Sequence, residues 1–443
     1  MIHQLITVFN EAFERLGVEA DPKAVEDLSV IVYKAMTLQA RNYHTLEHVF
    51  GFVDSADPLR TLAALYHDIV YHQVDRGFLP EIHQIIQPII VEREGQIYLV
   101  EQPPLDDRIL RMTLQIFGLR AGQVLRTNAG LNEFLSAIVM NRQLEPILTE
   151  EDLLGMTVCV EGSIPFRGED YFYQQEEKLR KISQEYNLLQ EEGDVEESIL
   201  RAVRFANHDV ESFAEEDTGR FLADTWKLLP ELNVALRWKE LYTIREYRQA
   251  LYQMEASLGN LPPERVFHSF QDVPSEQELK AKTERVRFNV LTASEYLNIK
   301  LLTQAILEGL AEATGGDAPL ALFMGDLPVG NGRPKRLEDF LPEIADGEWI
   351  DRDSVIYRLL KIGRTGTAGF DIEGSPLSLF IYKSLRPEEL HRLTRLAKEM
   401  FEGRLNPEEF LAQIDRPTLY SIAQASAEMV ITRRKELLRY TVQ

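Results

Sequence analysis

Apolar residues recur at the three- and four-residue spacing of amphipathic helices through most of this 443-residue chain. Leu5, Phe9, Phe13 and Leu16 form one such stripe, and residues 24–39 carry a second. Further helices are expected over 105–117, 131–140, 171–192, 195–211, 276–313 and 419–440. The pattern predicts an all-α protein.

Turn and capping residues divide this helical pattern. Asp57 followed by Pro58 is typical of a helix start, because Pro is tolerated in the first turn. The turn-rich segment LGNLPP over 258–263 is the expected domain boundary. We therefore expect a helical domain over 1–260 and a second, mostly helical region of unknown role over 261–443.

Two consecutive helices near the amino terminus carry residues that can bind metals. A helix expected over 44–53 places His44 and His48 four residues apart, which puts both imidazoles on one face. The next helix carries the adjacent pair His67 and Asp68. A short hairpin brings two such helices side by side.

Residues of these types gather in three short segments: YHTLEH over 43–48, YHD over 66–68 and NHD over 207–209. The chain has nine histidines, and five lie in or beside these segments: His44, His48, His67, His72 and His208. Imidazole and carboxylate groups together bind divalent Mn, Mg, Fe, Zn or Co. We therefore expect a site for one or two divalent metal ions.

The same segments resemble the motifs of the HD superfamily of metal-dependent phosphohydrolases. In the predicted bacterial HD phosphohydrolases the motifs look like YHNxxH, FHDxVYD and a later DADL, where this chain has YHTLEH, YHDIVYH and NHDV. A more distant resemblance is to cyclic-nucleotide phosphodiesterases. The resemblance covers roughly residues 25 to 215 and implies an HD-like helical bundle.

Residue by residue, the resemblance implies that His48, His67, Asp68 and Asp209 are metal ligands, with Asp68 also bridging to a second ion. It implies that His44 donates a proton to the leaving oxygen. His44 and Asp68 are therefore the expected catalytic residues. The implied activity is hydrolysis of a phosphate ester or nucleotide by metal-activated water.

Two positions depart from the family pattern. Thr45 stands where the family has Asn, and Tyr71 stands where the phosphodiesterases have a histidine, with His72 one residue later. Both departures weigh against specificity for cyclic nucleotides. Four residues are near-site candidates, the two arginines for phosphate contact: His72, His208, Arg201 and Arg204.

Two rival functions stay open. A di-iron oxygenase on the same scaffold would need additional ligands, which His72, His83 and His208 could supply. A non-catalytic regulatory or binding protein with a vestigial site would instead use the region after residue 260.

Composition and charge narrow the partners. The net charge of -23 argues against direct binding of nucleic acid or of an anionic membrane, whereas a small phosphorylated or nucleotide substrate stays compatible with it. No segment is typical of a membrane span or signal peptide, so we expect a cytoplasmic protein, and a homo-oligomer is left open. Cys159, the single cysteine, lies in an apolar segment and is expected to be a buried structural thiol.

Overall fold

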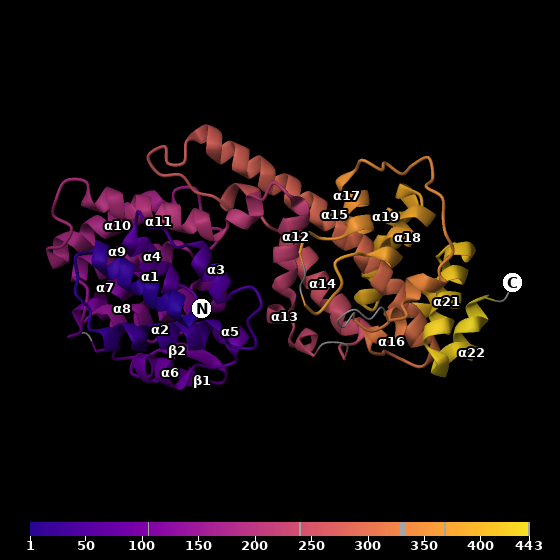
Figure 1. The fold of residues 1–443 in the computed structure, drawn as a ribbon, viewed down its shortest axis with the longest axis horizontal. Coiled ribbons are helices and arrows are strands. Elements are labelled where there is room, and N and C mark those ends of the chain that lie inside the picture. The colour runs from indigo at the N-terminus through magenta and orange to yellow at the C-terminus, as the bar shows by residue number, and fades with distance from the viewer. Residues whose placement is uncertain (105, 239–240, 328–333, 367–368, 442–443) are drawn as a thin grey trace. The chain divides into compact units, whose positions relative to one another are not determined.

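The computed structural model describes residues 1–104, 106–238, 241–327, 334–366 and 369–441. Helices dominate these residues (Figure 1), which confirms the all-α expectation. The described strands form one small antiparallel sheet that the sequence pattern did not predict, in the order β1 (Ile90–Arg93), β2 (Gln96–Leu99) and β3 (Val124–Leu125). Among the described helices, none is both long and apolar enough to cross a membrane.

The chain folds into two compact units, and each contains two segments of sequence. The first unit comprises residues 1–214 and 262–286, and the second comprises 215–261 and 287–443. This division differs from the single boundary expected near residue 260. The segment after that boundary belongs to the first unit because it supplies Phe270, which is fully buried in that unit's hydrophobic core.

The first unit contains eleven of the described α-helices and the start of a twelfth, α15 (Glu276–Thr314). The eleven are α1 (Ile2–Arg15), α2 (Pro22–Met36), α3 (Leu46–Gly51), α4 (Pro58–Tyr66), α5 (His72–Asp75), α6 (Pro80–Ile86), α7 (Arg108–Phe117), α8 (Leu131–Leu144), α9 (Glu150–Gly162), α10 (Tyr171–Tyr186) and α11 (Asp194–Asp209). Short 3-10 helices of this unit are η1 (Thr127–Ala129), η2 (Glu211–Ala214) and η4 (Pro263–Arg265).

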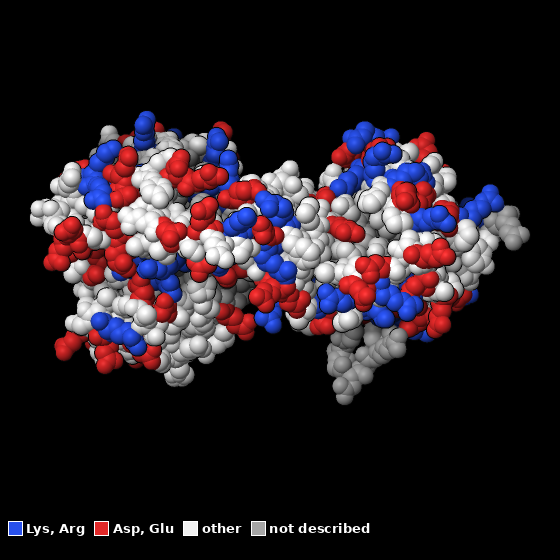
Figure 2. Space-filling model, turned by 90° about the horizontal axis from the view of Figure 1, so that it is seen from above, with Lys and Arg blue, Asp and Glu red and all other residues white. Residues whose placement is uncertain are grey.

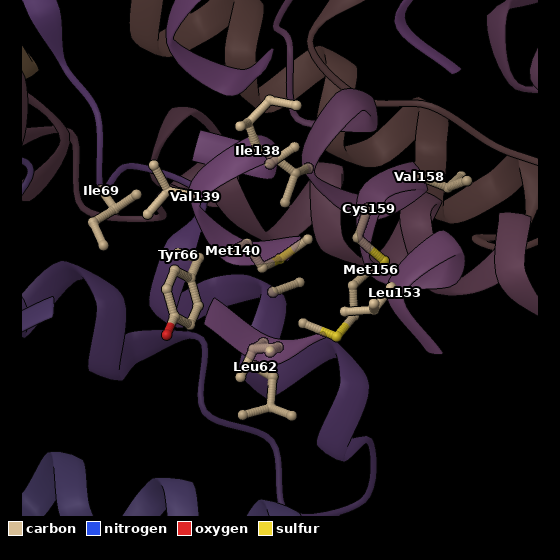
Figure 3. Packing of buried hydrophobic residues seen from close by; sticks show 14 of the residues in the cluster. Leu62, Tyr66, Ile69, Ile138, Val139, Met140, Leu153, Met156, Val158 and Cys159 are labelled. Carbon is tan, nitrogen blue, oxygen red and sulfur yellow. The ribbon is translucent and has the colours of Figure 1, made fainter. Parts of the chain in front are cut away.

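Helix α9 lies at the centre of the first unit, where it contacts α4, α7, α8 and α11. Figure 3 shows Met156 and Cys159 of α9 among the buried residues of the core, with Leu62 and Tyr66 of α4 and Met140 of α8. The Cys159 side chain is fully buried, which confirms the expected setting. Burial raises the pKa of this thiol to about 12, so it stays protonated and unreactive at neutral pH.

The second unit is built around the remainder of α15. Every residue from 299 to 311 of this helix is buried. The other helices of the unit are α12 (Thr218–Lys227), α13 (Leu229–Leu232), α14 (Ile244–Gly259), α16 (Leu320–Met324), α17 (Val355–Ile362), α18 (Pro376–Ser384), α19 (Pro387–Phe401), α20 (Pro407–Leu411), α21 (Arg416–Met429) and α22 (Arg434–Leu437), with the 3-10 helices η3 (Val234–Arg237), η5 (Leu337–Phe340), η6 (Ile431–Arg433) and η7 (Leu438–Thr441).

Charged side chains cover both units. On the face that Figure 2 presents, Lys and Arg side chains are interspersed with Asp and Glu. Neighbouring opposite charges on an exposed surface can form ion pairs, each of which contributes little to the free energy of unfolding.

Candidate metal centre

The candidate ligands lie within or at the ends of three helices. His48 lies within the short helix α3, His67 is the C-cap residue directly after α4, and Asp68 follows it in a turn. Asp209 is the last residue of α11. Helix ends suit metal ligands because the chain turns there and side chains from different helices can converge.

His44 does not share a helix with His48, so the expected helix over 44–53 is wrong at its start. Thr45 is the residue before α3 and has an extended backbone, with φ -114° and ψ 175°. His44 therefore lies in the preceding turn. Its ring centroid is still 5.8 Å from that of His48 and 4.4 Å from that of Tyr71.

Four predicted side chains converge on one small volume. His67 Nε2 lies 3.0 Å from Asp68 Oδ2 and 3.7 Å from Asp209 Oδ1. His48 Nε2 lies 3.6 Å from Asp68 Oδ2 and 3.5 Å from Asp209 Oδ1. Ligand atoms of His48, His67 and Asp68 all lie within 4.8 Å of one another. Two ligands of a single ion, each ~2.1 Å from it, are separated by about 3–4 Å, so these three donors suit one cation. Among the described residues Asp209 is not part of this mutually close group, although its Oδ1 lies within 3.7 Å of both imidazole nitrogens.

The two histidines present nitrogens that the described residues leave without a hydrogen bond. The Nε2 atoms of His48 and His67 are both buried, and neither has a hydrogen-bond partner within the described part of the chain. Each of these nitrogens instead lies at ion-pair distance from carboxylate oxygens of Asp68 and Asp209. The other nitrogen of His67, Nδ1, lies 2.8 Å from the carbonyl oxygen of Ala64. Since a carbonyl only accepts, Nδ1 carries the proton and the Nε2 lone pair is available to a metal when the ring is neutral.

The electrostatics of the cluster favour a cation. Burial alone would raise the pKa of Asp68, but the neighbouring His67, His44 and His48 hold it well below its usual range. Burial also opposes ionisation of Asp209, yet contacts with His48 and His67 lower its pKa to about 2. Both carboxylates are therefore ionised at neutral pH. Burial disfavours a charged His67, but these carboxylates raise its pKa well above the ordinary value, as expected of a cluster that attracts positive charge.

Arg41 fixes the turn that carries Asp68. Its buried guanidinium donates from Nη1 to the backbone oxygen of Asp68 at 2.6 Å. The same guanidinium donates to both carboxylate oxygens of Asp75, at 2.9 Å from Nε and 2.6 Å from Nη2. This positioning residue was not identified from the sequence, because a lone arginine after a helix is more often a surface residue.

Glu133 on α8 is a second residue of the site that was not identified from the sequence. Its Oε2 atom is buried with no hydrogen-bond partner among the described residues. Burial raises the pKa of this carboxyl to about 7, its own backbone N–H opposes the rise, and the charges of Asp68 and Asp209 add to it. The carboxyl therefore lies within the electrostatic reach of the cluster. An acid in the first turn of a helix is common for dipole reasons, so the sequence carried no distinguishing signal.

The near-site histidines have aromatic neighbours. The His208 ring stacks on Phe52 with centroids 4.6 Å apart, and burial lowers its pKa. The His72 ring lies 4.9 Å from Phe78, and the His83 ring lies 6.3 Å from the same phenylalanine. Among the described residues, the group of mutually close ligand atoms contains none of these three histidines.

The two arginine candidates bind carboxylates of the first unit. Arg201 donates from Nε to both oxygens of Asp57, at 2.8 and 3.0 Å. Arg204 Nη1 lies 3.6 Å from Glu197 Oε1. The contacts of Arg201 point to a structural pair, since Asp57 also caps α4 by accepting from the backbone N–H of Arg60. Phosphate contact by either arginine stays a prediction.

Comparison with known proteins found no relative of this chain. No family model matches the chain, and no curated protein or solved structure does so either.

Proposed function

We propose that His48, His67, Asp68 and Asp209 hold a divalent metal ion and that the chain hydrolyses a phosphate ester or nucleotide. One observation carries the metal proposal: two buried imidazole nitrogens without a hydrogen-bond partner among the described residues face two ionised carboxylates at 3.0 to 3.7 Å. Leaving such groups unsatisfied costs free energy, and a cation would satisfy all four.

The donor set fits this kind of ion. Two neutral imidazoles and two carboxylates bind Mn, Mg, Fe, Zn or Co, and availability decides among them. The second oxygen of Asp68 is the chain's candidate for contact with a second ion. When bound, such an ion supplies a Lewis acid for a phosphoryl oxygen and lowers the pKa of water.

His44 is the proposed proton donor to the leaving oxygen. It lies close enough to the cluster for its charge to lower the pKa of Asp68, yet it is not one of the mutually close ligand atoms of the described residues. An imidazole titrates near neutral pH and can therefore hold the proton that an alkoxide leaving group needs. We propose hydrolysis in preference to the di-iron oxygenase. The oxygenase would need His72, His83 or His208 as further metal ligands, and the described side-chain contacts of these three histidines are with aromatic rings.

The roles of His44 and His48 can be separated by substitution. The His44→Asn variant should keep its metal and lose turnover by about 100- to 10,000-fold, the usual contribution of a general acid. The His48→Asn variant should lose metal affinity first, with activity partly restored by excess metal. Metal content and hydrolysis rate are measured on the same preparations, using a panel of nucleotides and phosphomonoesters.

Two results would contradict this assignment. Loss of metal in His44→Asn with full retention in His48→Asn would reverse the two roles. A wild-type protein that carries metal and consumes O2, but hydrolyses no member of the panel, would favour the oxygenase.

A further inference from the structure

A small cavity lies inside the second unit, beside the fully buried part of α15. Its volume is about 50 Å³, and its wall includes Lys300, Gln304, Asp371 and Ser375. One buried water needs ~10–15 Å³ on the same measure, so the cavity has room for a few waters or a small ligand. Its wall combines apolar side chains with the polar and charged ones named above, and these polar and charged groups distinguish it from a packing defect in a purely apolar core.

The charges around the cavity do not balance. Asp371 Oδ2 lies 3.8 Å from Lys300 Nζ and 3.5 Å from Arg364 Nη2, so one carboxylate faces two cations. All three side chains are largely buried, with exposed fractions of 7% for Lys300, 11% for Asp371 and 0% for Arg364. One positive charge is therefore in excess in this cluster.

Asp371 also accepts hydrogen bonds from uncharged donors, and its Oδ1 accepts from the backbone N–H of Ile372 at 2.8 Å. Tyr247 donates its hydroxyl to Asp371 Oδ2 at 2.6 Å, and Trp226 donates from Nε1 to the same oxygen at 3.0 Å. Arg336, another residue of the cavity wall, has its own partner in Glu338, 2.7 Å away. No described carboxylate beyond Asp371 is thus paired with Lys300.

A buried charge on the same helix provides a contrast. Glu308 lies two turns further along α15 and is held by Arg248, which donates from Nε at 2.9 Å and from Nη2 at 3.1 Å. Lys300 makes weaker polar contacts, at 3.4 Å to Ser375 Oγ and 3.8 Å to Asp371, and its Nζ lies 5.3 to 5.9 Å from the ring centroids of three aromatic residues, Trp226, Tyr247 and Tyr296. Ring faces attract a cation but do not neutralise its charge. An ammonium group has three donors, so Lys300 can donate to a further acceptor.

Gln304 gives independent evidence that the cavity is built to bind something. It lines the cavity one helical turn after Lys300, and only 4% of its surface is exposed. Its Oε1 atom is buried with no hydrogen-bond partner in the described part of the chain. Since the two ends of an amide can exchange places, Gln304 can offer either a donor or an acceptor to a ligand.

We propose that this cavity binds a small oxyanion, a carboxylate or phosphate group, with Lys300 supplying the charge and Gln304 and Ser375 supplying hydrogen bonds. Burying an uncompensated charge is costly, and an oxyanion would remove the excess positive charge. The small volume restricts the ligand to a few heavy atoms. The proposal concerns the second unit alone and does not depend on the metal centre.

Calorimetric titration of the full chain tests the proposal. The protein is first treated with a chelator, so that phosphate cannot bind through a metal ion, and is then titrated with acetate, inorganic phosphate and neutral acetamide. Saturable one-to-one binding of acetate or phosphate, without binding of acetamide, is expected. Binding of only one of the two oxyanions identifies which group the cavity accepts.

Three variants locate the binding. Lys300→Met and Gln304→Leu should each lower the affinity for the oxyanion by about tenfold or more. Lys361→Met is the control: it removes an exposed lysine of the same unit and should change the affinity less than about twofold. Gln304→Leu keeps every charge of the cavity, so it still tests whether the oxyanion binds there if Lys300→Met fails to fold. Absence of saturable binding by both oxyanions, equal binding of acetamide, or unchanged affinity in Gln304→Leu would overturn the proposal.

Discussion

Two buried carboxyl groups of the first unit have pKa values shifted in opposite directions. Asp68 is held below its usual range because three histidines oppose the effect of burial. For Glu161 burial prevails and raises the pKa to about 7, although Arg167, Lys178 and a hydrogen bond from Gln175 lower it. The neighbours of each group, more than its depth, decide its charge at neutral pH.

The shift of Glu161 predicts a pH dependence of stability. Its folded-state pKa, about 7, lies above the unfolded value of 4.5, so the folded chain binds the additional proton between these pH values. The free energy of unfolding should therefore fall as pH rises through this window, by up to about 3 kcal/mol from this group. Glu161→Gln should remove that part of the fall, as measured by urea unfolding at about pH 5 and about pH 8.

Glu169→Gln is the matched control, because Glu169 is exposed on the same stretch of chain. It should reproduce the wild-type pH dependence. An unchanged pH dependence in Glu161→Gln would show that the buried carboxyl is ionised throughout this range.

At the site, motif spacing predicted which residues meet but not how the backbone carries them. His48, His67, Asp68 and Asp209 do converge, and metal binding by them stays a prediction. The predicted placement of His44 on the helix of His48 was wrong, because a four-residue spacing puts two side chains on one face only if the helix extends over both residues. The approach of Glu133 to the charges of Asp68 and Asp209 depends on tertiary packing, which a single sequence does not reveal.

At the scale of elements, long periodic helices were the most predictable. The helix expected over 276–313 is observed as α15, Glu276–Thr314. The helix expected over 419–440 is interrupted, because α21 ends at Met429 and Val430 takes a non-helical backbone with φ -97° and ψ 78°. Apolar spacing continues across this break and therefore could not reveal it.

The small sheet was missed because its strands are short. β1 and β2 have four residues each, too few for a convincing two-residue alternation. Their connection, Glu94 and Gly95, has positive φ at both positions, 52° and 72°, as in the tight turns of hairpins. The signal in the sequence that could have predicted this hairpin was the two-residue turn Glu94-Gly95 between two short segments with apolar residues.

The start of α4 illustrates how one carboxylate supports both an element and its packing. Asp57 accepts from the backbone N–H of Arg60 at 3.0 Å and from Arg201 on α11 at 2.8 Å. Asp57→Ala should lower the free energy of unfolding of the first unit by about 1–3 kcal/mol, since it removes a cap and deprives a largely buried arginine of its close carboxylate partner. Asp57→Asn keeps a capping oxygen and should cost less.

The comparison is made by urea unfolding, with Glu197→Ala as control. Glu197 is 54% exposed and 4.0 Å from Arg201, so its loss should change stability by less than about 0.5 kcal/mol. Equal effects of Asp57→Ala and Glu197→Ala would indicate that the Asp57 pair contributes nothing to α4.

At the scale of the whole molecule, the sequence indicated a break near residue 260 but not which unit the next segment joins. Residues 262–286 return to the first unit. The Asn207 side chain holds this segment, donating to the His268 carbonyl at 2.8 Å and accepting from the His268 N–H at 2.9 Å. Because Asn207 precedes the candidate ligand Asp209 by two residues, the returning segment supports the helix end that carries the ligand.

Phe270 tests this organisation. It is fully buried, and its ring lies 5.0 Å from that of Tyr173 on α10. Phe270→Ala in the full chain should destabilise the first unit by about 3–5 kcal/mol, the cost of removing a phenylalanine from a packed core. Urea unfolding measures the loss, and Tyr173→Phe, which keeps the ring, is the control. A loss below about 1 kcal/mol would mean that the segment does not belong to the core of the first unit.

Metal content per chain tests the central proposal most directly. The purified wild-type protein should carry one or two divalent ions per chain, and the double variant His67→Ala, Asp68→Ala should carry none while keeping its helical circular dichroism, since two ligands are lost. Asp209→Ala should also lose metal, whereas Glu211→Ala, which changes an acid two residues away, should retain it. Full metal retention in the double variant would contradict the assignment of the site.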